Sequence, residues 1–215
     1  MNLGVHDLPL FALAALLVNL TPGPDMLFVI GNSAARGRRA GVLAALGVGA
    51  GCMLHIAMAA VGLSALLAAS ATAFTLVKWV GAAYLVWVGL SMLRPQAPRS
   101  RVTPATDAAT TGPSRVFWQG ALTNALNPKV ALFFLAFLPQ FIEPGSANQG
   151  WAFVALGLLF NVGGTLVNVI AALLASGVRE RFEARGAVSR TGPWLQRAAG
   201  VLFVGLGLKL ALGSR

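Results

Sequence analysis

Long apolar runs with almost no charge make up most of this chain, and they restrict its possible folds more than any other feature. Between Leu8 and Ala34 the only formal charge is Asp25, and between Ala40 and Val77 there is none. A helix needs about 20 apolar residues to cross a bilayer, and a spanning backbone must be helical or part of a closed barrel. Because the runs lack the alternation of barrel strands, they predict an all-α polytopic membrane protein.

Composition agrees with lipid as the surrounding solvent. Charged residues make up 10% of the chain, against roughly 25% in ordinary domains. Lys and Arg outnumber Asp and Glu by 16 to 6, but they lie in loops between apolar runs, which favours a bilayer over nucleic acid as the partner. The single cysteine, Cys52, has no partner in the chain, and no metal or cofactor motif is present. We therefore expect no cofactor and no bound metal.

We expect six spanning helices, three in each half of the chain. The predicted spans are residues 8–34, 40–67, 74–93, 116–142, 150–176 and 194–212, with a short turn at 69–73. The one linker-like segment is polar and contains prolines. The predicted organisation is therefore a three-helix repeat at residues 1–95, a cytoplasmic linker at 96–115 and a second three-helix repeat at 116–215.

The distribution of basic residues predicts the orientation. Three loops on one side hold eleven of them: Arg36, Arg38, Arg39, Arg94, Arg99, Arg101, Arg115, Arg179, Arg181, Arg185 and Arg190. The opposite side holds three: Lys78, Lys209 and Arg215. Because cytoplasmic loops carry the excess of Lys and Arg, both termini are predicted to lie outside.

The two halves resemble each other. Residues 82–90 of the third span match residues 198–206 of the sixth at five of nine positions, and proline interrupts the first and fourth spans at Thr21-Pro22 and Asn127-Pro128. An odd number of spans per half makes the second half enter the membrane from the opposite side. This pattern predicts two inverted repeats, which are typical of secondary transporters.

The proline sites predict breaks in the first and fourth helices. Proline removes a helical hydrogen bond, and glycine adds backbone freedom, so Thr21-Pro22-Gly23-Pro24-Asp25 should not continue a regular helix. Pro128 should have the same effect in the fourth span. Irregular backbone at membrane depth is tolerated against protein or a wet cavity, where paired broken helices form ligand sites.

Each predicted break carries one charge, Asp25 or Lys129. An ionisable group at the bilayer centre costs at least about 2.5–3.5 kcal/mol, so each should have a polar partner or a function. One interpretation is a buried ion pair that only holds the halves together. In the other, the pair exchanges partners with a substrate; each neutral single variant should then lose export, and the double variant should fold better than either.

Other polar side chains inside the spans have two interpretations each. Asn19, Asn124, Asn127, Asn161 and Asn168 either hydrogen-bond between helices or line a site. Asn161 and Asn168 share one helix face. His55 follows Gly47 and Gly51 on a small-residue stripe, which favours a packed histidine over a proton relay.

The two motifs, Thr21-Pro22-Gly23-Pro24-Asp25 and Asn127-Pro128-Lys129, together with Phe137-Leu138-Pro139-Gln140-Phe141, resemble the LysE/RhtB family of bacterial amino-acid exporters. The resemblance covers nearly the whole chain. It implies export of an amino acid or a close derivative across the bacterial inner membrane, driven by the proton gradient or the membrane potential. It does not select the amino acid.

The residues fit this chemistry. Asp25 would bind a substrate ammonium group, while Lys129 and the N–H groups of a half-helix would bind its carboxylate. Asn127 and Asn161 complete the predicted site, with Thr21, Pro22, Gly23, Pro24 and Pro128 shaping the breaks.

Alternatives are a channel, an intramembrane enzyme and an exporter of metal ions or other small solutes. The last two lack support, because the spans hold no nucleophile motif and Asp25 is their only carboxylate. The sequence leaves a homo-oligomer open.

Overall fold

The computed structural model describes residues 3–63, 79, 83, 86, 90, 112–143, 145–182, 204, 205 and 208. In order, its elements are α1 (Leu8–Leu20), α2 (Pro24–Arg36), α3 (Arg38–Met58), the π-helix η1 (Ala59–Leu63), α6 (Pro113–Ala125), α7 (Pro128–Leu132), the π-helix η2 (Phe133–Phe137), the 3-10 helix η3 (Leu138–Phe141) and α8 (Gln149–Phe182). The predicted turn at 69–73 lies outside the described residues, as do nearly all of the spans at 74–93 and 194–212 and most of the linker.

Four helical units in the described ranges correspond to predicted spans. Residues 38–63 and 149–176 are each long and apolar enough to cross a bilayer alone. The pair of α1 and α2 meets the same test only as a unit, as does the pair of α6 and residues 128–141. The first pair is bent by 50° and the second by 44°. The predicted breaks in helices one and four are therefore confirmed.

The helix α6 begins at Pro113, before the predicted start of the second repeat at Val116. Hydropathy locates only the apolar segment of the span. The helix itself can begin before that segment where the preceding residues favour the first turn of a helix. Pro113 occupies the first turn, where its missing N–H leaves no helical bond unmade. The polar segment 113–115 therefore belongs to the helix.

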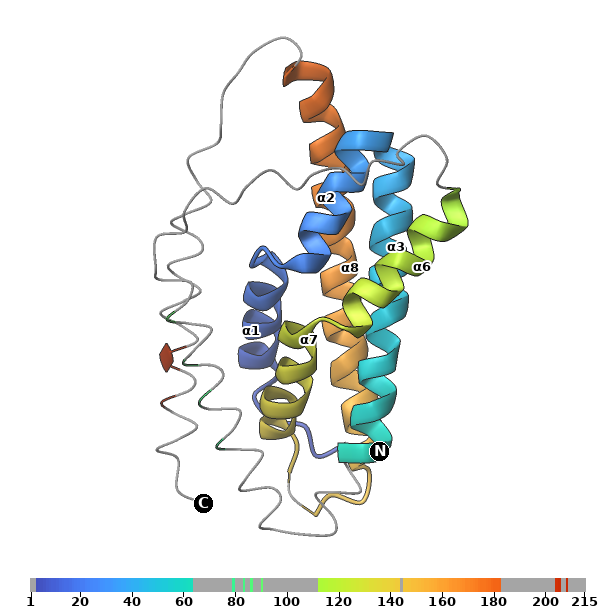
Figure 1. The fold of residues 1–215 in the computed structure, drawn as a ribbon. Helices are drawn as coiled ribbons and strands as arrows, with labels where there is room; N and C mark the ends of the chain where they lie inside the picture. Colours follow the sequence, from blue (N-terminus) through green and yellow to red (C-terminus); the bar gives the residue numbers. More distant parts are fainter. Residues whose placement is uncertain are drawn as a thin grey trace.

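The two bent pairs run in opposite directions, which Figure 1 shows along the axis of the bundle. The segment before α1 meets the end of η3 through an antiparallel bridge between Val5 and Ile142. There the N–H of His6 donates to Phe141 at 3.0 Å, and the N–H of Glu143 donates to Gly4 at 2.8 Å. The start of the first pair thus touches the end of the second, as an inverted arrangement requires.

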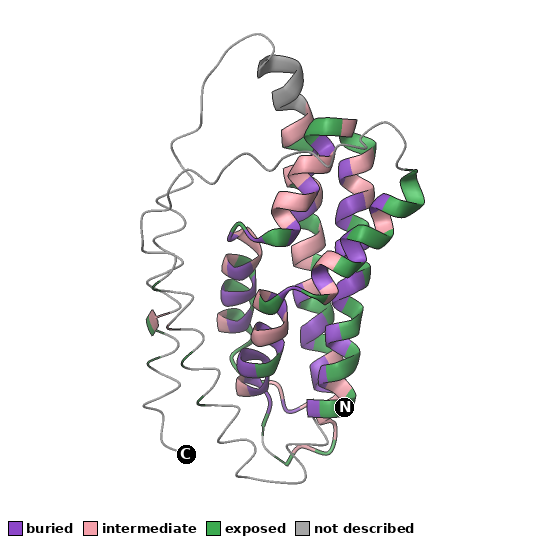
Figure 2. Ribbon diagram, viewed as in Figure 1, coloured by how far each residue is buried: buried purple, intermediate pink, exposed green. Residues whose placement is uncertain are grey.

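Exposed and buried positions alternate along the helices of the bundle (Figure 2), and many of the exposed positions carry large apolar side chains while several polar ones are buried. The exposed side chains of α3 and α8 include Leu46, Met53, Leu54, Leu158, Val162, Leu166 and Leu174. Asp25, Asn124, Asn127 and Asn168 are each less than 9% exposed. A protein in water would bury most of the large apolar side chains and expose the polar ones. This surface is therefore suited to contact with lipid.

Helices α3 and α6 cross at close range because glycines face backbone. A Cβ atom on Gly47 would overlap the carbonyl oxygen of Phe117, and one on Gly51 would overlap that of Ala121. From the opposite helix, a Cβ on Gly120 would lie 2.7 Å from the carbonyl oxygen of Ala44. Small residues that let backbones approach are typical of helix contacts in membranes. The predicted packing stripe is therefore confirmed.

We expect Gly51→Ala to destabilise the protein, because the added methyl group meets rigid backbone rather than a movable side chain. Overpacking costs about 1–3 kcal/mol, so the melting temperature in detergent should fall by several degrees. Gly31→Ala in α2 is the matched control, because its Cβ would meet nothing within 4 Å. Equal melting temperatures for the two variants would show that the close crossing is absent in the membrane protein.

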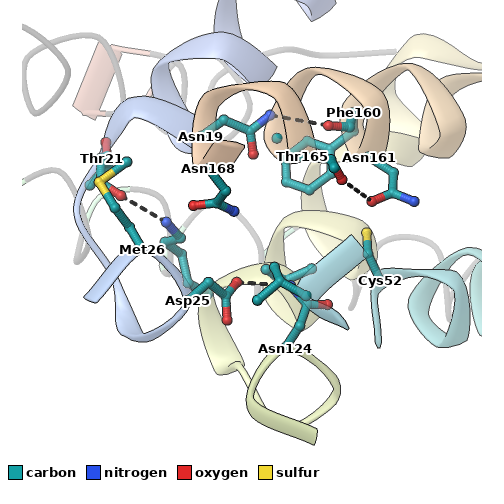
Figure 3. A pocket seen from close by; sticks show the side chains of 14 residues that line it. Asn19, Thr21, Asp25, Met26, Cys52, Asn124, Phe160, Asn161, Thr165 and Asn168 are labelled. Carbon is teal, nitrogen blue, oxygen red and sulfur yellow. Dashed lines mark hydrogen bonds between the residues drawn. The ribbon is translucent and has the colours of Figure 1, made fainter. Parts of the chain in front are cut away.

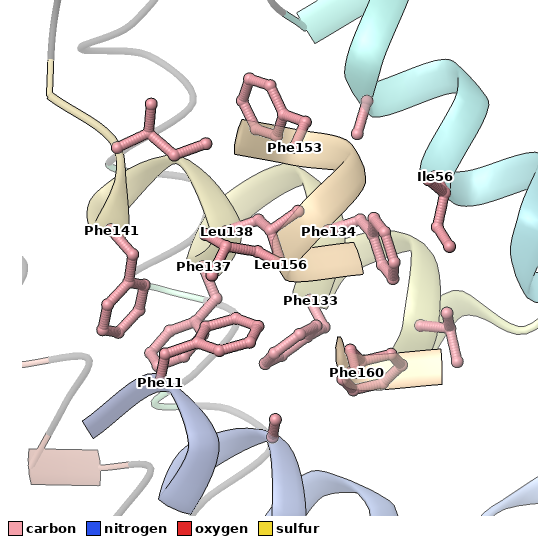
Figure 4. Close-up of a cluster of buried hydrophobic side chains, with 14 of the residues drawn as sticks. Phe11, Ile56, Phe133, Phe134, Phe137, Leu138, Phe141, Phe153, Leu156 and Phe160 are labelled. Carbon is pink, nitrogen blue, oxygen red and sulfur yellow. The ribbon is translucent and has the colours of Figure 1, made fainter. Parts of the chain in front are cut away.

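Two apolar clusters divide the core. The larger cluster contains the aromatic rings of Figure 4 and occupies the end near the Val5–Ile142 bridge. Its members include Phe11, Phe133, Phe137, Phe141, Phe153 and Phe160, and the rings of Phe133 and Phe160 stack at 4.5 Å. The smaller cluster contains Val29, Ala44, Ala45, Val48, Val116 and Ala172. Both helix breaks lie between the two clusters.

Candidate functional site

The first break leaves a carbonyl group without its helical donor. In a continuous helix the N–H of residue 22 would bond to the carbonyl of Val18, but Pro22 has no N–H. The ammonium group of Lys129 donates to this oxygen at 3.1 Å and to the carbonyl of Thr21 at 3.0 Å. A cation from α7 thus completes the carbonyl-rich end of α1, which also favours positive charge through the helix dipole.

The second break also leaves a carbonyl group without its helical donor, and His55 donates to this carbonyl. Pro128 cannot donate to the carbonyl of Asn124, which instead accepts from Nε2 of His55 at 3.0 Å and from the N–H of Asn127 at 2.8 Å. The side-chain oxygen of Asn127 accepts from the N–H of Lys129 at 3.0 Å and so caps α7. His55 therefore has a structural partner in the backbone of the second break.

Asp25 lies in the first turn of α2 and is bound from the second break. The side-chain amides of Asn124 and Asn127 each donate to its Oδ2 atom at 2.8 Å. Its other oxygen, Oδ1, is buried without a hydrogen-bond partner, and so is Oδ1 of Asn124. A buried acceptor without a partner costs about 1–3 kcal/mol, so this site can gain by taking up a donor.

The two charges are therefore bound crosswise between the bent pairs. Lys129 of the second pair binds the first break, and Asp25 of the first pair is bound by the second. Both residues lie in the described ranges, and they are not within ion-pair distance of each other. The direct ion pair considered from the sequence is wrong, because backbone carbonyls and side-chain amides at the breaks supply the partners instead.

Gly23 makes room for this arrangement. A Cβ atom at this position would lie 3.0 Å from Nζ of Lys129. Gly23 lies between Pro22 and Pro24, so the motif combines two residues that break the helix with one that admits the ammonium group. Pro22, Pro24 and Pro128 are exposed and shape the breaks without facing the interior.

A small polar cavity lies beside the breaks, with a volume of about 30 Å³ (Figure 3). One water needs about 10–15 Å³ of such space, so the cavity has room for roughly two. It is lined by Asn19, Thr21, Asp25, Met26, Val48, Cys52, Asn124, Lys129, Val130, Phe160, Asn161, Gly164, Thr165 and Asn168. Val48 belongs to the smaller apolar cluster and Phe160 to the aromatic one, so apolar side chains adjoin the cavity on both sides.

The structure thus brings Thr21, Asp25, Lys129 and Asn161 to one cavity, with Asn127 bound to Asp25. Sequence reasoning left Asn124 and Asn168 among the helix amides and did not single out Thr165. The signal for the α8 residues was their spacing, because positions 161, 165 and 168 fall on one helix face. Asn161 and Asn19 also bond between helices, to Gly49 at 3.2 Å and to Phe160 at 3.1 Å.

The charges available for ligands are few. Within the described ranges, no group of three or more His, Cys, Asp or Glu side chains comes together in a way that could hold a metal ion. One carboxylate and one ammonium group line the cavity, and the remaining polar groups are amides and hydroxyls. This set matches a small zwitterion, because each charged end of such a molecule would meet a group of opposite charge.

The comparison with protein families identifies the chain. The family described as LysE type translocator matches residues 16–214. The chain belongs to this family. Membership in the LysE type translocators agrees with the apolar exterior and with the resemblance noted from the two proline motifs, since the family consists of membrane transporters.

Relatives of this LysE family member match along nearly their whole length. An uncharacterized membrane protein of Pseudomonas aeruginosa is 36% identical over 99% of this chain and 98% of its own. A leucine efflux protein of Klebsiella pneumoniae is 30% identical over 97% of this chain and 96% of its own. A threonine efflux protein of Escherichia coli is 29% identical over 94% and 95%. No solved structure matches the chain.

Proposed function

We propose that this protein exports an amino acid or a close derivative from the cytoplasm, driven by the proton gradient or the membrane potential. The observation that carries the proposal is the crosswise binding of Asp25 and Lys129 at two opposed helix breaks beside a small polar cavity. Membership in the LysE family and the names of the leucine and threonine efflux relatives support the same substrate class.

Recognition of the substrate follows from the unused hydrogen-bonding capacity of the site. The Oδ1 atom of Asp25 is a buried acceptor that an ammonium group can fill. Lys129 has three N–H donors and uses two of them on carbonyls, so one is available for a substrate carboxylate. The substrate would therefore bind between the two charges, and its α-amino and α-carboxyl groups would connect the two halves.

Transport would proceed by alternating access. A cavity of about 30 Å³ is too small for an amino acid, so the halves must move apart on one side to admit it. The apolar clusters on the two sides of the cavity are the segments that would have to open. Since Asp25 is the one carboxylate among the described residues that line the cavity, we propose it as the proton carrier, exchanging its proton for the substrate ammonium group.

Uptake into inside-out membrane vesicles tests the function. Labelled amino acid is added outside the vesicles. Vesicles that contain the protein should accumulate it when their interior is made acidic or positive relative to the outside. A protonophore should abolish accumulation, while exchange of labelled for unlabelled substrate should persist. If none of the twenty common amino acids exchanges and a divalent cation does, the alternative of a metal-ion exporter is correct.

We propose that both termini lie outside in the bacterial inner membrane. The described basic residues support this. At one end of the bundle α2 ends and α3 and α6 begin (Figure 1), and these helix ends carry Arg36, Arg38, Arg39 and Arg115. At the other end α1 begins and η3 ends, next to Asp7 and Glu143 in the sequence. In a Cys52→Ala background, Glu143→Cys should react with an impermeant thiol reagent in intact cells, and Arg39→Cys should not. The opposite labelling pattern would reverse the orientation.

We further infer that the protein is not an enzyme, since its family consists of transporters. Its partners are then the bilayer and a small solute. The sequence leaves open whether the protein forms a homo-oligomer, and crosslinking in native membranes would test this.

A further inference from the structure

Among the described polar side chains that line the cavity, Asn168 is the one that forms no hydrogen bond. It is 7% exposed and lines the cavity. The hydrogen bonds of the described residues include none to its amide, although an amide can donate two and accept two. Figure 3 shows the Asn168 amide between Asn19 and Asp25, inside the ring of lining residues.

The neighbours of Asn168 on the same face of α8 differ in this respect. The Asn161 amide donates to the carbonyl of Gly49 at 3.2 Å, and the Thr165 hydroxyl donates to Oδ1 of Asn161 at 3.4 Å. These two groups connect α8 to α3 and to each other. Among the described residues Asn168 makes no such connection, so hydrogen bonding between helices does not explain why a polar side chain is buried here.

The charges of the cavity limit what Asn168 can recognise. If Asp25 and Lys129 bind the α-amino and α-carboxyl groups, no other carboxylate or ammonium group among the described lining residues is left for an ionised substrate side chain. The remaining lining side chains are amides, one further hydroxyl at Thr165 and small or apolar groups. The side chain of the substrate must then be uncharged.

We propose that Asn168 selects the side chain of the substrate and that this side chain is small, uncharged and able to form a hydrogen bond through a hydroxyl or amide group. The inference rests on the proposed function, since it assigns the remaining part of the same site. An aliphatic side chain of equal size would leave the buried amide without a partner. A site built around a hydrogen bond rejects the analogue that lacks it much more strongly than a hydrophobic pocket rejects an added hydroxyl.

Threonine and valine are the appropriate probes, because they have nearly the same shape and differ in one hydroxyl group. We expect the purified protein in proteoliposomes to exchange threonine with a kcat/KM at least about tenfold above that for valine, as the penalty for an unpaired buried polar group implies. In Asn168→Val this ratio should fall to about one, mainly through loss of threonine exchange.

Two further variants separate selectivity from folding. Ser176→Ala removes a hydroxyl from α8 outside the cavity, where Ser176 bonds to the carbonyl of Leu173 at 2.9 Å, and should keep the wild-type ratio. Asn168→Ser keeps a hydrogen-bonding group and should retain a preference for threonine. If Asn168→Val does not fold, the ratio of kcat/KM for threonine over valine in the wild type and in Asn168→Ser still tests whether Asn168 selects the substrate side chain.

The outcomes distinguish the two proposals. Equal exchange of threonine and valine by the wild type, or an unchanged ratio in Asn168→Val, would overturn the role of Asn168 and leave amino-acid export in place. Preferential exchange of lysine or glutamate would overturn the uncharged substrate class. Exchange of no amino acid at all would overturn the proposed function and this inference with it.

Discussion

Asp25→Asn is expected to abolish export while leaving the protein folded. The asparagine side chain keeps an oxygen that can accept from Asn124 and Asn127, so the bonds between α2 and the second break can persist. The negative charge is lost, and with it both the partner of the substrate ammonium group and the proposed proton site. Hydrogen bonds to charged groups are worth about 1.5–3 kcal/mol, so substrate affinity should fall about ten- to hundredfold.

Exchange and net transport in proteoliposomes should be measured together for this variant. Loss of both, with an unchanged elution profile and melting temperature, supports a direct role of Asp25 in transport. If Asp25→Asn still performs proton-dependent net export, Asp25 does not carry the proton. Asp7→Asn is the matched control, because Asp7 is exposed near the N-terminus and pairs only with His6 in the described structure.

Lys129→Met should both destabilise the protein and stop export. Without the ammonium group, the carbonyls of Val18 and Thr21 lose a donor, and Pro22 cannot supply one. The Val18 carbonyl keeps the N–H of Thr21 at 3.2 Å, but the Thr21 carbonyl loses the ammonium donor. A buried carbonyl without a partner costs about 1–3 kcal/mol, which should be visible as a lower melting temperature and a smaller folded yield. Lys129→Gln keeps N–H donors without the charge, so it should fold better than Lys129→Met and still fail to export.

The double variant Asp25→Asn with Lys129→Met tests whether the two charges depend on each other. From the sequence, the hypothesis of a coupled pair that exchanges partners with the substrate predicted that the double variant would fold better than either single one. Because the structure gives the two side chains separate hydrogen-bond partners, we now expect the double variant to be no more stable than Lys129→Met alone. A double variant that is more stable than Lys129→Met would show that the charges pair directly in the membrane.

The spans and breaks were predictable because they depend on local properties of the chain. A span requires a run of apolar residues of bilayer length, and charges mark its ends, so residues 38–63 and 149–176 could be located from hydropathy. Pro22 and Pro128 lack the N–H group that a continuous helix needs, whatever surrounds them. The 50° and 44° bends follow at these positions.

The partners of the breaks could not be predicted, because they come from residues far away in the sequence. The carbonyl of Val18 lacks the N–H of residue 22, but only the packing of α7 near the end of α1 selects Lys129 as an additional donor to it. The same holds for His55 at the second break, where the close crossing of α3 and α6 brings its ring to Asn124.

The sequence by itself determined that this chain is a membrane protein with two charged, proline-broken helices, since burial in lipid and the chemistry of proline act at each position separately. Only the tertiary structure decided that Asp25 and Lys129 are bound crosswise rather than to each other, and that Asn168 is left without a partner in the cavity. The physical reason is that hydrogen bonding depends on distance and direction between atoms, and these are set by how the helices pack.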